Sequence, residues 1–495
     1  MRLWTRRSKA TAAGIAAALG IGLLAGCSSG ATDKPDNKLT VWSLESLPPR
    51  MAATQKIVDR FEDKTGISVK LVGVSEAQLP QMIMSAAAAG RLPDVIAALP
   101  LGQMWQMYSN GLVNTRVPGE VIKRLGPGTF DANALRLASD RGTRLGVPSD
   151  AWLQLLVYRQ DLFERDGLPA PESYRDLLRA ADRLDVRGRD GISAATDPAD
   201  VFTQQSFESL ALANGCRLID GAEDGAEEGA EEGAEEGAED GAEDDAGDGE
   251  GDVALDSPSC RTAFTTYDTL ARRHGAPGTQ TVDSTRAGYF SGKSAMVIWS
   301  SFLLDELAGL RKDALPSCPQ CARDRSFLAD NSGIVTALKG PDGQGEAAQF
   351  GDITSWTVTR TAETEATKTF LTYMMTSGYE DWFGMAPEGK IPVRTGTAAA
   401  PDRYRRAWRA SDMGVDVKRP MNEVFPDTLL DELAAGVGRI KRWGIEQGEG
   451  ALVGALNGEL PIPKIVSAMT GGQLSPDRAA HDAAEEVTAL RRSLR

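Results

Sequence analysis

The chain has 495 residues, enough for two domains, with 41% hydrophobic residues and a formal net charge of −16. Seventeen acidic residues and no basic ones lie between Asp220 and Asp252; without these, 53 acidic residues face 54 basic ones. The rest of the chain is therefore nearly neutral, which argues against nucleic acid as a partner, because nucleic-acid binding needs a basic surface.

The N-terminus has the pattern of a bacterial secretion signal, with an uncharged apolar run over 10–25 that ends in Leu24-Ala25-Gly26-Cys27. The basic residues that precede this run are Arg2, Arg6, Arg7 and Lys9. The ending resembles a lipobox, in which the cysteine is acylated, for instance with palmitate, and the chain is cut before it. A transmembrane anchor is the alternative, but a span needs about 20 apolar residues and this run is shorter. We predict a lipoprotein signal peptide over 1–26, lipid attachment at Cys27 and a flexible tether over 27–37.

After the tether, predicted strands and helices begin to alternate. The segment 38–42 is a predicted strand, and 51–64 is a predicted helix that Gly66 ends. A second strand follows at 67–71, where apolar and polar residues alternate. Strand, helix and strand in this order form a βαβ unit, which implies parallel strands.

Further elements continue the alternation to the C-terminus. The apolar segments 93–98, 152–158 and 295–298 are predicted strands, whereas 174–184 and 476–494 show helical spacing of their apolar side chains. Because strands and helices alternate along the chain, we predict an α/β fold.

An acidic segment interrupts this pattern at 220–252. It holds six copies of Gly-Ala-Glu-(Glu/Asp) and no apolar side chain larger than Ala between Gly221 and Asp244. Such a segment cannot bury enough apolar surface to fold, so we predict a disordered, solvated extension of a hairpin. A calcium loop at 244–255 is the alternative, but Ala246 and Leu255 stand where that loop needs oxygen ligands.

Four cysteines besides Cys27 are present, together with only two histidines. An even number of cysteines outside the cytoplasm favours disulfides. Cys216 and Cys260 flank the acidic segment, and Cys318 and Cys321 form a CxxC pair, so we predict that these four residues are disulfide-bonded. A zinc site would need two further Cys or His ligands beside the CxxC pair, and we predict no metal site. A redox role for this pair is the remaining alternative.

Four blocks of sequence carry a family resemblance. They are Leu39-Thr40-Val41-Trp42 with the elements that follow to Val69, Gly146-Val147-Pro148-Ser149-Asp150-Ala151-Trp152 with its continuation to Pro169, Tyr289-Phe290-Ser291-Gly292-Lys293-Ser294-Ala295-Met296, and Gly389-Lys390-Ile391-Pro392-Val393-Arg394. Taken in this order they resemble the carbohydrate-type extracellular solute-binding proteins of bacterial ABC importers, the maltose-binding protein group. Gln160, where the family has Asn, and the acidic segment depart from the family pattern.

The resemblance implies a two-lobed periplasmic-binding-protein-like fold, in which the lobes close on a ligand in the cleft between them. The expected parts are lobe 1 over 38–140 with 352–386, lobe 2 over 141–351 with 387–495, and chain crossings near 140–145, 334–354 and 384–392. It also implies capture of a sugar or oligosaccharide and delivery to the transmembrane subunits of an ABC permease. We accordingly expect a monomer, lipid-anchored on the extracytoplasmic face of the cell membrane and without a cofactor.

Six residues are candidates for ligand contact, because sugars need aromatic rings for their C–H faces and polar groups for their hydroxyls. In the resembling family, motif positions equivalent to Trp152, Trp299 and Trp356 lie at the cleft, while Trp105 fits either cleft or core. Glu45 and Asp150 follow predicted strand ends, where carboxylates can accept hydrogen bonds from hydroxyls. The alternative is that the tryptophans belong to the core and that the two carboxylates are merely solvated.

A secreted lipoprotein enzyme is the rival class. A glycoside hydrolase needs a pair of carboxylates, which this many acidic residues can supply. Apart from Gly26-Cys27-Ser28-Ser29-Gly30 at the lipobox, the sequence contains no GxSxG motif. It contains no HExxH or Walker A motif, and two histidines offer little for His-based catalysis. We predict a binding protein without catalytic residues, with a small polar non-sugar solute as the alternative ligand.

Overall fold

The structure is a computed structural model that describes residues 37–220, 251–343 and 347–494. The predicted signal peptide, the lipid site at Cys27, the tether up to residue 36 and the acidic repeats over 221–250 lie outside these residues. Across the described ranges, no helix is both long enough and apolar enough to cross a membrane.

The described strands form one large sheet and two short hairpins. The sheet contains β1 (Lys38–Ser43), β2 (Ser68–Gly73), β3 (Val95–Pro100), β6 (Val147–Arg159), β7 (Met296–Ser300), β8 (Ser332–Val335), β9 (Gln349–Val358), β10 (Ile391–Pro392) and β13 (Ile440–Lys441). The hairpins are β4 (Ser139–Asp140) with β5 (Thr143–Arg144), and β11 (Asp412–Met413) with β12 (Arg419–Pro420).

Helices account for most of the remaining chain. Those before the acidic segment are α1 (Pro48–Thr65), α2 (Leu79–Ala88), α3 (Leu101–Ser109), α4 (Arg116–Leu125), α5 (Ala132–Leu137), α6 (Gln160–Asp166), α7 (Tyr174–Leu184) and α8 (Val201–Ala213). Those after it are α9 (Pro258–Asp268), α10 (Val282–Phe290), α11 (Leu303–Leu307), α12 (Phe327–Asp330), α13 (Thr364–Met374), α14 (Tyr379–Gly384), α15 (Arg403–Arg409), α16 (Met421–Val424), α17 (Asp427–Gly436), α18 (Gly450–Glu459), α19 (Pro461–Thr470) and α20 (Pro476–Ser493).

The N-terminal βαβ unit is present as predicted. β1 and β2 pair in parallel, with Leu39 opposite Val69. Pro48 and Pro49 open α1, where the missing N–H of proline leaves no helical hydrogen bond unmade. Gly66 ends the helix with φ +72°, a conformation that glycine adopts without steric cost.

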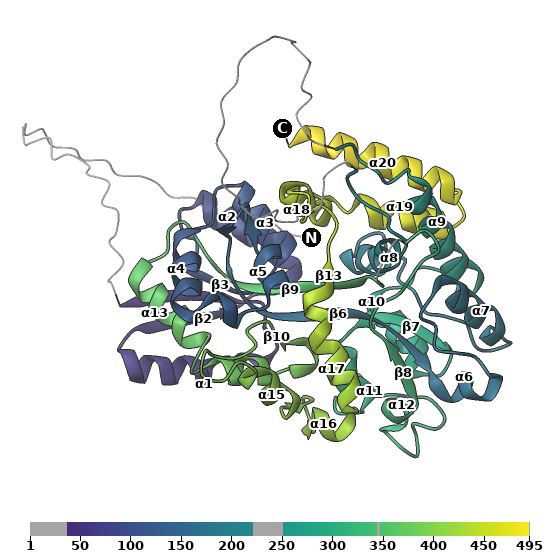
Figure 1. Cartoon of the computed structure of the whole chain (residues 1–495), viewed down its shortest axis with the longest axis horizontal. Coiled ribbons are helices and arrows are strands. Elements are labelled where there is room, and N and C mark those ends of the chain that lie inside the picture. The colour runs from purple at the N-terminus through teal and green to yellow at the C-terminus, as the bar shows by residue number, and fades with distance from the viewer. Residues whose placement is uncertain (1–36, 221–250, 344–346, 495) are drawn as a thin grey trace, which may run out of the picture. The chain divides into compact units, whose positions relative to one another are not determined.

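β6 is shared by two parts of the sheet (Figure 1). Its first half pairs with β9 and β10, and its second half, from Gln154 onward, pairs with β7 and β8. Residues 139–140 and 143–144 form the β4–β5 hairpin, and the shared strand begins just after it at Val147. The strand continues as one buried element over 147–159 through both parts of the sheet. The chain crossing near 140–145 stays a prediction.

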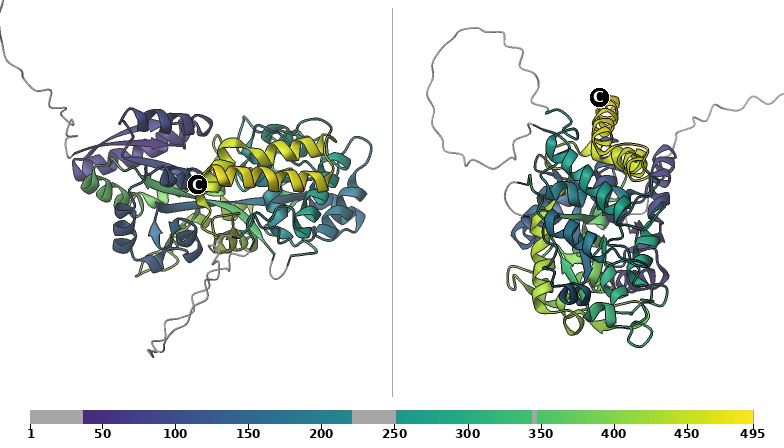
Figure 2. Two further views of the ribbon diagram at one scale, coloured as in Figure 1. Left: turned by 90° about the horizontal axis from the view of Figure 1, so that it is seen from above. Right: turned by 90° about the vertical axis from the view of Figure 1, so that its right-hand side faces the viewer.

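The buried apolar side chains form two hydrophobic cores. The first includes Val41 of β1, Phe61 of α1 and Phe370 of α13. The second includes Phe207 of α8 and Val487 of α20. Figure 2 shows α19 and α20 side by side, as their contacts require. The lobe boundaries given above stay predictions.

Both expected cysteine pairs are bonded, Cys216 to Cys260 with an S–S distance of 2.06 Å and Cys318 to Cys321 with one of 1.99 Å. The backbone N–H of Asp220 donates to the carbonyl of Asp252 at 2.8 Å, which draws the two ends of the acidic segment together. No group of three or more His, Cys, Asp or Glu among the described residues is arranged to hold a metal ion.

Candidate functional site

The paired strands β6 and β9 present a polar and aromatic face where the two parts of the sheet meet. Residues directly opposite in an antiparallel pair share a face, and Trp152 lies opposite Asp352 while Asp150 lies opposite Thr354. Alternation along each strand adds Gln154 and Phe350 to the same side. We call these six residues the crossing face: Asp150, Trp152, Gln154, Phe350, Asp352 and Thr354.

Helices cover both ends of the crossing face and leave Trp152 partly exposed between them. At one end, Trp382 of α14 donates from Nε1 to Asp150 Oδ1 at 2.7 Å. At the other, Gln154 Nε2 donates to Ser206 Oγ of α8 at 3.4 Å. Asp150 and Gln154 are buried, whereas Trp152 between them is partly exposed. Trp152 is therefore the residue of this face most available to a ligand.

A buried lysine joins two of the predicted carboxylates. Lys390 Nζ lies 2.6 Å from Glu45 Oε1 and 3.2 Å from Asp150 Oδ2, and Lys390 is only 1% exposed. Thr354 Oγ1 also donates to Asp150 Oδ2, at 2.6 Å. Asp150 was expected in a loop; it lies inside β6 instead, and its hydrogen-bonding capacity is taken up by protein groups.

Glu45 lies in the loop after β1 and is held by two cations. Its Oε2 accepts a hydrogen bond from Arg50 Nη1 at 2.9 Å, in addition to the contact with Lys390. Burial alone would raise the pKa of Glu45, but the charges of Lys390 and Arg50 outweigh burial and lower the pKa from 4.5 to about 2. Glu45 is therefore ionised at neutral pH.

A second buried ion cluster holds the middle of the crossing face. Arg442 Nη1 lies 2.8 Å from Asp352 Oδ2, and its Nε lies 3.6 Å from Glu208 Oε1 of α8. The Arg442 guanidinium also lies 4.9 Å from the ring centroid of Phe350. Asp352 Oδ1 accepts from the backbone N–H of Leu101 at 3.2 Å, so Asp352 connects Arg442 with the start of α3.

Glu76 belongs to the same region, although the sequence analysis did not single it out. It follows β2, the parallel neighbour of the strand that precedes Glu45, and the carboxyl ends of parallel strands are where α/β folds bind ligands. Glu76 is exposed, and partial loss of water around its carboxyl together with the nearby carboxylates of Asp352, Asp200 and Glu45 raises its pKa. The predicted βαβ unit was the sequence signal that could have found it. Arg442 and Asp352 had no comparable signal.

Two of the predicted tryptophans are fully packed. Trp356 has no exposed surface, and its ring centroid lies 4.5 Å from that of Trp382 and 5.8 Å from that of Phe370. Trp105 is 3% exposed, and a Cβ placed on Gly450 of α18 would lie 1.9 Å from its ring. Neither ring offers a face to a ligand in this structure, because both fill space between packed elements.

The other two predicted tryptophans retain some accessible surface. Trp299 is 8% exposed, donates from Nε1 to the carbonyl of Val282 at 3.1 Å, and packs against Phe202 with 5.8 Å between ring centroids. Trp152 is partly exposed and lies 6.0 Å from Phe350, centroid to centroid. Trp299 of β7 lies opposite Leu155 of β6, so it is on the other face of the sheet from Trp152.

Asp305 of α11 is a buried acid with an unusual environment. Within the described ranges, neither of its carboxyl oxygens has a hydrogen-bond partner. Burial raises the pKa of Asp305 above its ordinary 3.8, and the negative charge of Glu388 adds to this effect. Asp305 is therefore protonated at neutral pH.

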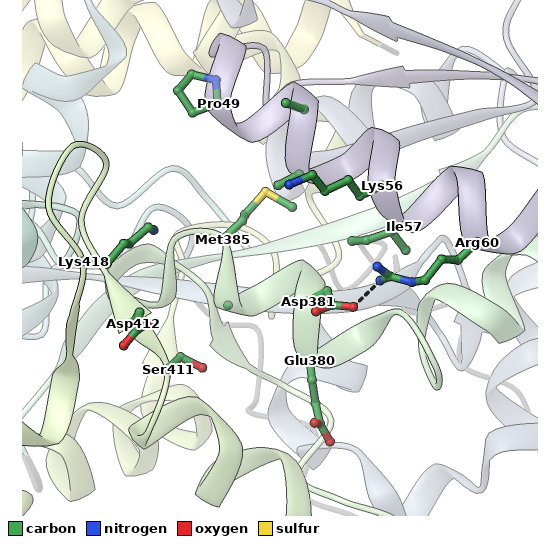
Figure 3. Close-up of a pocket in the computed structure, with 13 residues that line it drawn as sticks. Pro49, Lys56, Ile57, Arg60, Glu380, Asp381, Met385, Ser411, Asp412 and Lys418 are labelled. Carbon is green, nitrogen blue, oxygen red and sulfur yellow. Dashed lines mark hydrogen bonds and ion pairs between the residues drawn. The ribbon is translucent and has the colours of Figure 1, made fainter.

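A groove of about 460 Å³ lies between α1, α14 and the β11–β12 hairpin (Figure 3). Lys56 and Arg60 line it from α1 and Glu380 and Asp381 from α14, and Arg60 forms an ion pair with Asp381. Its lining includes none of the six predicted site residues and no member of the crossing face. The groove is therefore a separate feature of the surface.

Residues 56–410 match the family described as bacterial extracellular solute-binding protein. The chain belongs to this family. The match confirms the resemblance carried by the four sequence blocks. This solute-binding protein is also 26% identical over 432 residues to the putative ABC transporter periplasmic-binding protein YcjN of Escherichia coli (strain K12), with 85% of each chain covered.

Solved structures confirm the two-lobed fold of this solute-binding protein. Maltose-bound MalE3 of T. maritima matches with a TM-score of 0.65 and 16% identity, covering 92% of this chain and 99% of that one. The GacH receptor of Streptomyces glaucescens, solved unliganded and with acarbose, matches with a TM-score of 0.64 and 17% identity, covering 92% and 98%. At such low identity the likeness establishes the fold and not the ligand.

Proposed function

We propose that this protein is the substrate-binding component of an ABC importer and that it captures a sugar or oligosaccharide between its lobes. Family membership supplies the binding role. The importer is supported by the name of the Escherichia coli relative. The sugar is supported by structural relatives solved with maltose, with acarbose and with maltotetraose.

The observation that carries the proposal is the partly exposed ring of Trp152 beside Asp352 on the crossing face. A pyranose can place its apolar C–H face on an aromatic ring while its hydroxyls donate to neighbouring carboxylates. β6 and β9 run between the two parts of the fold, so a ligand on Trp152 is within reach of both. Such a ligand would favour the closed arrangement of the lobes.

We assign direct ligand contact to Trp152, with Glu45, Glu76 and Asp352 as hydrogen-bond acceptors. Trp299 is left out of this set, because it lies on the other face of the sheet from Trp152. We assign Trp105, Asp150 and Trp356 to the support of this surface, because they are only 3%, 1% and 0% exposed, less than any residue assigned to ligand contact.

A thermal-shift titration of the 28–495 fragment tests the ligand class. Maltose, maltotetraose, tagatose and ribitol are the probes, with glutamate as the non-carbohydrate comparison. Because a ligand that binds only the folded state stabilises it, a sugar at 100 times its Kd should add about 2.7 kcal/mol. Stabilisation by glutamate alone would contradict the sugar assignment. Hydrolysis of a probe during the assay would favour the enzyme alternative.

We further propose that the mature protein is held on the outer face of the cell membrane by acyl chains on Cys27. A single chain binds a membrane only marginally, so we expect more than one chain. Cys27→Ala should move the protein from the membrane fraction to the soluble fraction, measured by fractionation and immunoblotting. Membrane retention of this variant would refute the anchor.

A further inference from the structure

The fourth sequence block, Gly389 to Arg394, contains a lysine that the proposed function leaves without a role. Lys390 lies between the turn at 387–389 and β10, which pairs with β6 through Pro392 opposite Asp150. Its ammonium is buried and enters the space between the loop after β1 and the crossing face. It therefore lies where three chain segments distant in sequence meet.

The ammonium of Lys390 has three close contacts. Nζ lies 2.6 Å from Glu45 Oε1, 3.2 Å from Asp150 Oδ2 and 4.3 Å from the ring centroid of Trp382. Trp382 in turn donates to the second oxygen of Asp150 at 2.7 Å. Lys390 thus contacts the carboxylates of both Glu45 and Asp150. Trp382 packs against the Lys390 ammonium and also orients the Asp150 carboxylate by its hydrogen bond.

The charges around Lys390 are nearly balanced. Glu45 has a second cation, Arg50, whereas Lys390 is the only cation that contacts Asp150 among the described residues. Arg50 also lies 3.7 Å from Glu388. A buried carboxylate that loses its cationic partner is costly, and Lys390 is that partner for Asp150.

The chemistry of Lys390 excludes a nucleophilic role. Burial alone would lower the pKa of this ammonium, but the carboxylates of Asp150 and Glu45 outweigh burial and raise it above its ordinary value. Lys390 therefore stays protonated at neutral pH and acts as a fixed positive charge.

We propose that Lys390 is a positioning residue, whose ammonium holds the Glu45 carboxylate at the mouth of the crossing face by tying it to Asp150. The ligand-related part of this inference rests on the proposed function, since Glu45 is one of the acceptors assigned there. The contacts of Lys390 with Glu45 and Asp150 do not depend on which ligand is bound. Lys390 fixes both the direction and the ionisation of Glu45, so that ligand binding does not depend on pH near neutrality.

Three variants separate this role from ordinary packing. Lys390→Met keeps the apolar stem and removes the charge, Lys390→Arg keeps the charge, and Lys123→Met makes the same change at an exposed site on α4. The first readout is the carboxyl ¹³C titration of Glu45. We expect its proton affinity to rise at least tenfold in Lys390→Met, even with Arg50 in place, and to stay within threefold of wild type in the other two variants.

The second readout is the affinity for maltose or whichever probe shifts the wild-type melting temperature. It should fall at least tenfold in Lys390→Met, with a further loss as pH falls through the raised pKa of Glu45, and recover in Lys390→Arg. An unchanged Glu45 titration in Lys390→Met would overturn the proposal. A wild-type protein that binds no probe sugar would instead count against the proposed function, while the titration would still decide the role of Lys390.

If Lys390→Met fails to fold, double variants are used in its place. Asp150→Asn/Lys390→Met removes the pair and should recover folding, because no unpaired charge is left on β6. Glu45→Gln/Lys390→Met should recover less, because Arg50 still pairs with Glu45 in the single variant. Equal recovery by the two double variants would overturn the assignment of Lys390 as the partner of Asp150.

Discussion

Asp305 shows how one buried residue couples stability to pH. Its pKa is raised in the folded state by burial and then by Glu388, so between the ordinary 3.8 and the raised value the folded protein holds a proton that the unfolded chain releases. This contribution to stability is therefore lost as pH rises from about 4 toward and through neutrality. Asp305→Asn removes the linked proton, and we expect it to raise the unfolding free energy at pH 7 by at least about 1 kcal/mol.

Chemical denaturation of wild type and Asp305→Asn at pH 5, 7 and 8.5 measures this effect. The difference between the two proteins should grow with pH. A difference that stays constant over this range would show that Asp305 does not change its protonation on unfolding.

The tryptophans provide a second contrast at the residue scale. Trp152 is partly exposed, so Trp152→Ala should weaken binding of the probe sugar by about 1–3 kcal/mol and lower the melting temperature little. Trp356 has no exposed surface, so Trp356→Ala should cost about 3–5 kcal/mol of stability. Calorimetry of binding and of unfolding on both variants measures the two effects. The reverse pattern would place the ligand away from Trp152.

At the scale of elements, the Cys216–Cys260 disulfide closes the loop that contains the acidic segment. The bond closes a loop of 45 residues, which contributes about 4 kcal/mol on the chain-entropy account. Deletion of 221–250 shortens the loop by 30 residues and should lower that contribution by about 1 kcal/mol. A cycle that combines this deletion with Cys216→Ala/Cys260→Ala, read by denaturation, measures the change. An identical disulfide contribution in both backgrounds would contradict the loop-length argument.

At the scale of the whole molecule, the shared strands β6 and β9 determine what ligand binding should do. A solute on Trp152 lies where both strands pass between the two parts of the fold, so binding should favour closure. We expect the radius of gyration from small-angle X-ray scattering to fall when the effective probe is saturating. Trp152→Ala should show no fall at the same concentration. A radius unchanged in saturated wild type would mean that binding occurs without closure.

Elements that arise from local spacing and capping were predictable from the amino-acid sequence. The strand at 38–42, the helix ended by Gly66 and the helix at 174–184 follow from spacing and capping, and β1, α1 and α7 match them. The cysteine pairs followed from their number and position. The four blocks also identified the family, because motifs in a fixed order survive where overall identity is low.

Only the tertiary structure decided which predicted site residues remain accessible. Asp150 and Trp356 are both on strands, and sequence alone cannot show that Trp382 covers them while Trp152, two residues from Asp150, stays partly open. Lys390 and Arg442 were equally unpredictable as partners of Glu45 and Asp352, because each contact joins segments more than 80 residues apart. Burial and long-range pairing depend on which elements pack together in three dimensions. The local spacing of residues along the chain does not determine that packing.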